Sequence, residues 1–153
     1  MDKKRITGEK LLDAWLKLSS TVWNSRVVST MTFNETYVCN LLHHQMENNP
    51  ETRLTATDLC EKMGLFKSQM NKVLKSMEES GYIKKVRSEK DKRFVYIEIT
   101  EKGLAQYKTE HEEVMKIMDR LVDKIGYERT EATAKSVNDI SDEFISYTRG
   151  ENK

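Results

Sequence analysis

One segment of this sequence gathers side chains whose types suit the binding of phosphate. Between Lys67 and Arg93 there are nine Lys or Arg residues against four acidic ones, a net charge of +5 in a chain whose total is +1. The rest of the chain therefore carries −4. Clustered ammonium and guanidinium groups are typical of phosphate binding, and solvated surface charge is the alternative interpretation.

The first half of this segment predicts a helix from Phe66 to Ser80. Its apolar residues recur at helical spacing: Met70, Val73, Leu74 and Met77. The remaining positions put hydrogen-bond donors and positive charge on its exposed surface: Lys67, Ser68, Gln69, Asn71, Lys72 and Lys75. We therefore expect a polar, basic face opposite an apolar stripe.

The second half predicts two strands, at about residues 82–87 and 93–99. In the second, Val95, Ile97 and Ile99 alternate with polar residues, as a half-buried strand requires. The dense charge from Arg87 to Arg93 is then the loop of a hairpin.

Helices are predicted before this segment. The first covers about residues 7–29, and its wide apolar face comprises Leu11, Leu12, Trp15, Leu16, Leu18, Val22 and Trp23. A second, from Asn34 to about Asn48, buries Val38, Leu41 and Leu42 and stops before Pro50. A short third begins at a capping box, Thr55 to Asp58, and ends at Gly64. With the next helix it forms a helix-turn-helix candidate.

Two more helices are predicted after the hairpin. Thr100 is the expected N-cap of a long helix with a coiled-coil-like seam: Leu104, Tyr107, His111, Val114, Met118, Leu121 and Ile125. After Gly126, a last helix carries Val137, Ile140, Phe144 and Tyr147 on one face.

Composition indicates one compact domain in 153 residues with 37% apolar content. The N-terminal residues lack the apolar region of a signal peptide, and no run of about 18 apolar residues occurs. We expect a soluble, cytoplasmic protein that does not enter a membrane. Cys39 and Cys60 form no disulfide framework or paired metal motif, so we expect reduced thiols.

The stretch from Leu54 to Gly103 resembles the DNA-binding core of the MarR family of bacterial transcriptional regulators. The wing motif of that family, D-x-R followed by a strand and T-x-x-G, is matched by Asp91, Arg93, Thr100 and Gly103. The resemblance implies an α+β, mostly α fold, one domain over residues 1–153. It implies a winged helix-turn-helix core at 34–103 and long dimerisation helices at 6–30 and 104–148.

By this resemblance the hairpin is a wing that enters the minor groove. Arg93 is expected to occupy narrow A·T-rich segments, where the negative potential is enhanced. Asp91 is expected to hold the wing through Arg93 or Arg87, while Lys90 and Lys92 bind phosphates.

The predicted helix at 66–80 is, by the same resemblance, the recognition helix in the major groove. Gln69 and Asn71 can bind a base edge with two hydrogen bonds, most naturally adenine, and Lys72 can donate to guanine or to phosphate. Phe66 stands where the family usually has a Ser or Thr cap, so we expect the helix to begin slightly later, with Ser68 as its cap.

The implied function is sequence-specific binding of double-stranded DNA. A homodimer would bind a palindromic operator, usually as a repressor, and a small, often aromatic effector would release it. Trp15, Trp23, Tyr37 and His111 are the candidate walls of the effector pocket. No nucleophile elbow or phosphate-binding Gly loop indicates catalysis, and we expect neither an enzyme nor a metal or other cofactor.

Two other functions stay open at this stage. One is a winged helix that binds an acidic partner protein through its basic face. The other is a metal- or redox-sensing regulator of the same fold, because Cys39, His43 and Glu47 share a helix face at spacings that could bind zinc. Such a face is more often polar surface, Cys60 is expected to be structural, and His111 is expected in a core or an interface.

Overall fold

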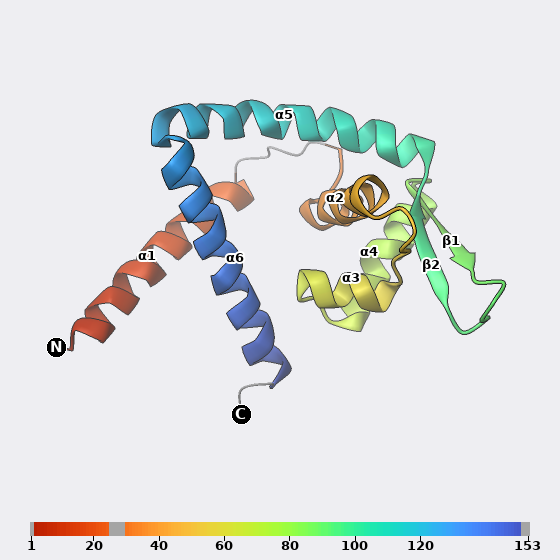
Figure 1. Cartoon of the computed structure of the whole chain (residues 1–153), viewed down its shortest axis with the longest axis horizontal. Helices are drawn as coiled ribbons and strands as arrows, with labels where there is room; N and C mark the ends of the chain where they lie inside the picture. Colours follow the sequence, from red (N-terminus) through yellow and green to blue (C-terminus); the bar gives the residue numbers. More distant parts are fainter. Residues whose placement is uncertain (1, 25–29, 151–153) are drawn as a thin grey trace.

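The computed structural model of this chain describes residues 2–24 and 30–150, and residues 23 and 24 by their backbone alone (Figure 1). Six helices and one hairpin follow in the order α1 (Lys3–Asn24), α2 (Phe33–Asn48), α3 (Ala56–Met63), α4 (Lys67–Glu79), β1 (Ile83–Arg87), β2 (Val95–Ile99), α5 (Glu101–Ile125) and α6 (Tyr127–Arg149). Helix α5 spans the molecule, with the hairpin and α2–α4 beside its first half and α1 and α6 beside its second half (Figure 1). The mostly helical α+β fold expected from the sequence is confirmed.

The hydrophobic core lies between α2, α3, α4, the hairpin and the first turns of α5. Its buried apolar residues are Met31, Val38, Cys39, Leu42, Leu54, Leu59, Met70, Leu74, Met77, Ile83, Ile97 and Tyr107. The apolar spacing of α4 accounts for three of these, because residues three or four apart share one helix face. Gly64 ends α3 with a φ of +67°, a left-handed conformation that favours glycine. Helix-turn-helix and core are therefore one packed unit.

The hairpin is joined to this unit through backbone hydrogen bonds. Strands β1 and β2 pair antiparallel, with Ile83 opposite Ile99. The amide of Ile97 donates to the carbonyl of Leu54 at 2.8 Å, so the segment before α3 lies along the outer edge of β2. The wing and the helix-turn-helix are thus held in a fixed relation.

The expected T-x-x-G motif forms the junction between β2 and α5. The Thr100 hydroxyl donates to the carbonyl of Gly81 at 2.6 Å and accepts from the amide of Gly103 at 3.0 Å. A Cβ on Gly103 would lie 2.1 Å from the carbonyl oxygen of Tyr82, which is backbone and cannot move aside. Glycine is required here because α5 begins directly against the turn that follows α4.

Helices α1 and α6 leave their apolar faces exposed. The exposed residues on α1 include Ile6, Leu11, Leu12, Trp15, Leu16, Leu18 and Val22, and α6 has no buried residue. The ring of Trp15 contacts that of Phe144 with 4.8 Å between centroids. Helix α1 was predicted over 7–29 and instead begins at Lys3; the predicted end and the side chain of Trp23 lie outside the described residues. Within the described chain, no helix is long and apolar enough to cross a membrane.

Candidate nucleic-acid interface

Helix α4 presents every side chain that the sequence predicted for its polar face. Lys67, Ser68, Gln69, Asn71, Lys72 and Lys75 are all exposed. The opposite face buries Met70, Leu74 and Met77 in the core. Burial of that stripe fixes the rotation of the helix about its own axis, so the polar face points to solvent.

The start of α4 differs from the prediction. The helix begins at Lys67, with Phe66 and not Ser68 in the N-cap position, so the expectation of a Ser68 cap was wrong. A phenyl ring cannot accept a hydrogen bond, and the amide of Phe66 donates instead to Oε1 of Gln69 at 3.0 Å. The side chain of Gln69, in the first turn of the helix, thus accepts a hydrogen bond from the backbone N–H of the N-cap residue. This bond also occupies the acceptor of Gln69, which the predicted two-bond contact with adenine would require.

A buried carboxylate on α2 is bonded to α4 and helps to position it. Glu35 is 6% exposed, and its Oε1 accepts from the Ser76 hydroxyl of α4 at 2.8 Å. Its Oε2 accepts from the amide of Thr32 at 2.9 Å, which completes a capping box at the start of α2. This pair was not expected from the sequence. The signal was present in the T-x-x-E spacing of Thr32 and Glu35, which marks a helix start but does not reveal its partner on α4.

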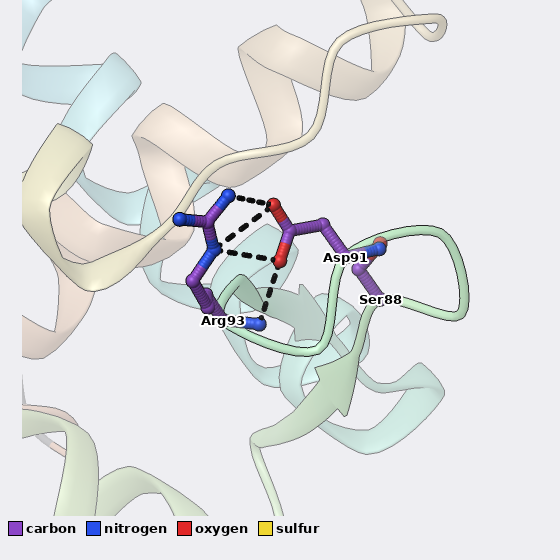
Figure 2. Close-up of polar contacts among 3 residues, drawn as sticks. All are labelled: Ser88, Asp91 and Arg93. Atoms are coloured by element: carbon purple, nitrogen blue, oxygen red, sulfur yellow. Dashed lines mark hydrogen bonds and ion pairs between the residues drawn. The ribbon is translucent and has the colours of Figure 1, made fainter.

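The tip of the wing is a closed turn organised by Asp91 (Figure 2). Its carboxylate accepts from Nη2 of Arg93 at 2.7 Å, from Nε at 3.0 and 3.2 Å, and from the backbone amide at 3.1 Å. The amide of Asp91 donates to the Ser88 hydroxyl at 3.2 Å. These hydrogen bonds from Arg93 hold the pKa of the Asp91 carboxyl below its ordinary value.

The two arginines of the hairpin have different roles in this turn. Arg93, with a side chain 87% exposed, is the partner of Asp91. Arg87, the last residue of β1, donates from Nη1 to the carbonyl of Lys92 at 2.7 Å. Lys90 and Lys92 are exposed on the loop itself. The turn therefore directs four cationic side chains into solvent from a backbone that is already ordered.

Arg53 supports the base of the wing, a role that was not expected from the sequence. Its guanidinium lies over the ring of Tyr96, 4.4 Å from the centroid, and pairs with Glu98. Lys84 also contacts Glu98, at 3.4 Å. The contact joins the segment before α3 to β2, and no local pattern in the sequence indicates a partner 45 residues away.

The face of α2 that carries Cys39, His43 and Glu47, considered above as an alternative zinc site, divides between core and surface. Cys39 is fully buried, contrary to the expectation of a polar surface, while His43 is half-buried and Glu47 is exposed. Burial, with a smaller contribution from Glu35, raises the pKa of the Cys39 thiol to about 12. Among the described residues, no group of three or more His, Cys, Asp or Glu is placed to hold a metal ion.

Cys60, His43 and His111 pack against neighbouring residues. Cys60 is half-buried at the edge of the core. His43 and His111 each lie 5.5 Å, centroid to centroid, from the ring of Tyr107. The hydroxyl of Tyr107 donates to Asn40 at 2.9 Å. Tyr107 and His111 both lie on α5, so the ring contact that joins α2 to α5 is that of His43 with Tyr107.

A surface groove of about 370 Å³ separates α6 from the helix-turn-helix. Its lining comes from three helices: Tyr37, Leu41, Glu61, Lys62, Asp142, Ile145, Ser146 and Arg149. At its end, Nη2 of Arg149 donates to the carbonyl of Cys60 at 3.0 Å, which links α6 to α3. Of the four predicted effector-pocket walls, Tyr37 lines this groove, whereas Trp15 contacts Phe144 and His111 contacts Tyr107.

Comparison with known proteins agrees with this architecture. The sequence model of the family described as "Transcriptional regulator SarA/Rot" matches residues 25–110. The uncharacterized HTH-type transcriptional regulator YfiV of Bacillus subtilis (strain 168) is 29% identical over 94 residues, which are 61% of this chain and 58% of that protein. The match to this chain thus spans under two thirds of that relative's length.

Solved structures show the same fold. The transcriptional regulator BldR from Sulfolobus solfataricus superimposes with a TM-score of 0.69 at 17% identity, covering 92% of this chain and 97% of that one. The PcaV transcriptional regulator from Streptomyces coelicolor, solved in complex with its natural ligand, gives 0.68 at 20% identity over 86% and 89%. The winged-helix regulator fold that the resemblance to the MarR family implied is confirmed.

Proposed function

This chain belongs to the SarA/Rot family of transcriptional regulators, and we propose that it binds a palindromic DNA operator as a homodimer and represses transcription from it. It would act in the cytoplasm, as one functional unit. Residues 34–103 form the DNA-binding core in this proposal, and residues 6–30 and 104–148 form the dimerisation region.

The observation that carries the proposal is the pairing of two cationic features on one rigid core. Helix α4 exposes Lys67, Lys72 and Lys75, and the wing exposes Arg87, Lys90, Lys92 and Arg93. A helix of this width fits the major groove, and a hairpin tip fits the narrower minor groove beside it. We propose that α4 contacts base edges, that Arg93 enters the minor groove, and that the lysines bind phosphates.

The homodimer is inferred from the exposed apolar side chains of α1, α5 and α6. Leu11, Leu16 and Leu18 are each more than half exposed, and Met118 and Leu121 on α5 are about 41% exposed. Soluble monomers rarely expose contiguous apolar patches larger than a few hundred Å². A second copy is the occupant proposed here, because a two-fold axis would bury the same residues of both chains and orient two recognition helices toward one duplex.

A small-molecule effector is proposed to act at the groove between α6 and the helix-turn-helix. The groove is large enough for a compact organic ligand, and its wall combines the ring of Tyr37 with the charged groups of Lys62 and Arg149. A ligand that displaced Arg149 from the carbonyl of Cys60 would uncouple the dimerisation helices from α3. The separation of the two recognition helices would then change, and with it the fit to the operator.

The test is a DNA-binding titration of the purified full chain. Duplexes enriched by the protein from a random library are titrated at several salt concentrations, and sedimentation gives the protein's oligomeric state. We expect a dimer that prefers the enriched sequence over random duplex and loses affinity steeply with salt. A monodisperse monomer, or equal affinity for all duplexes with tight binding to an acidic protein instead, would contradict the proposal.

A further inference from the structure

We propose that Phe66 is a specificity-determining residue, whose ring contacts the C5-methyl group of a thymine in the major groove. The proposal rests on the DNA-binding function proposed above. It adds a contact that the resemblance to known regulators did not supply, because Phe66 stands where a polar cap was expected.

The first observation is the exposure of the ring. Phe66 is 69% exposed, more than any of the other three phenylalanines; the next is Phe33 at 57%. The side chain of phenylalanine has no polar atom that could form a hydrogen bond with water. The ring is not part of the buried core cluster, to which α4 contributes Met70 and Leu74. The fold therefore gives no reason for an aromatic side chain here.

The second observation is that capping of α4 does not need the Phe66 side chain. The hydrogen bond from the Phe66 amide to Oε1 of Gln69 and the bond from the Met70 amide to the Phe66 carbonyl, at 3.0 Å each, use only the backbone of Phe66. Any residue other than proline could make these two backbone bonds in this conformation, and Ser, Thr, Asp or Asn would add a side-chain cap that phenylalanine cannot. The ring is consequently free to serve binding.

The third observation is the position of the ring. Phe66 precedes the first turn of α4, and the N-terminal residues of a recognition helix are those that contact base edges. Exposed Lys67 and Lys72 lie on the same helix and complement the charge of the phosphates. In the major groove, the thymine C5-methyl is the apolar group that a base pair presents, and an aromatic ring is among the side chains that contact it. The minor groove presents no methyl group.

Gln69 sharpens the expected sequence. Its Oε1 is occupied by the Phe66 amide, so its amide group approaches DNA as a donor. Donors pair with N7 of a purine or O6 of guanine. We therefore expect each half-site to contain a thymine beside a guanine, the base that presents both of these acceptors in the major groove.

The test replaces single thymines by deoxyuridine, which removes only the C5-methyl group. The full-length dimer is titrated against its library-enriched duplex with each thymine of a half-site replaced in turn. Wild type should lose about fourfold in affinity at one position in each half-site, the value of one buried methyl group. Phe66→Ala should bind the thymine and deoxyuridine duplexes equally, and Phe66→Leu should keep part of the difference.

A matched control is Phe33→Ala, which removes another exposed phenyl ring, at the start of α2, and should keep the wild-type response to deoxyuridine. Circular dichroism confirms that each variant is folded. The proposal is overturned if wild type responds at no thymine, or if Phe66→Ala responds as wild type does. Operator binding would survive in both cases, so the proposed function would stand. Absence of sequence preference for any duplex would overturn both.

Discussion

Asp91 and Arg93 form a forked ion pair at the tip of the wing, in which Nε and Nη2 of the arginine both reach the carboxylate (Figure 2). The two residues are separated by Lys92 alone, so the pair closes a tight turn as well as orienting a guanidinium. The arginine keeps an 87% exposed side chain while its direction is fixed. An oriented, exposed guanidinium loses less conformational entropy when it enters a groove.

Arg93→Ala should weaken operator binding by about 1–3 kcal/mol and relax the preference for A·T pairs under the wing, because the narrow minor groove attracts a guanidinium. Lys72→Ala should instead affect base pairs of the major-groove half-site. Fluorescence anisotropy titrations against the operator and its variants at fixed salt measure both effects. Equal losses on operator and random duplex would mean that the residue contacts phosphate only.

The carboxyl of Asp91 should titrate below its ordinary range, and Arg93→Ala should raise its midpoint. A pKa lowered in the folded state means that the pair contributes fully at neutral pH and is lost as the pH falls below about 4. Carboxyl chemical shifts followed by NMR in both proteins give the two midpoints. Identical midpoints would contradict the assignment of Arg93 as the partner of Asp91.

The sequence predicted the local parts of this interface because their causes are local. Met70, Leu74 and Met77, which are spaced three or four residues apart, are buried on one face of α4 as expected. The motif that contains Asp91 and Arg93 indicated the position of the wing. The sequence left open whether Asp91 pairs with Arg93 or with Arg87. The choice depends on the closed turn, which no periodic pattern encodes.

Contacts between distant segments could not be predicted. Glu35 and Ser76 are 41 residues apart, and Arg149 and Cys60 are 89 apart. Cys39 was expected on a polar surface because its neighbours at helical spacing are His43 and Glu47. Packing of α2 under α5 buries Cys39 and leaves Glu47 exposed. Such outcomes depend on how helices meet.

Gly103→Ala should destabilise the protein by about 3 kcal/mol, because the added Cβ would lie 2.1 Å from the carbonyl oxygen of Tyr82. Gly8→Ala is the matched control. Gly8 lies inside α1 with open space around its Cβ position, so alanine there should stabilise by about 1 kcal/mol. Urea unfolding at equal protein concentrations measures both. A neutral Gly103→Ala would show that α5 does not begin directly against the Tyr82 carbonyl.

Cys39 should resist alkylation in the folded protein. Its thiol is fully buried and its pKa is raised to about 12, so the reactive thiolate is scarce at pH 8. Iodoacetamide labelling followed by mass spectrometry should modify Cys39 at a substantial rate only after unfolding in denaturant. Rapid labelling of Cys39 in the native protein would instead support a redox-sensing role.

The spacing of the two half-sites tests the central claim, an operator-reading dimer, most directly. Two recognition helices related by a two-fold axis enter major grooves on one face of the duplex, about 34 Å or 10 base pairs apart. Inserting about five base pairs between the half-sites moves one of them to the opposite face. Affinity for that duplex, measured at the same salt concentration, should fall to the level of random DNA. An affinity unchanged by the insertion, with the same dependence on salt, would contradict the account and leave the basic surface of α4 and the wing as a sequence-independent electrostatic patch.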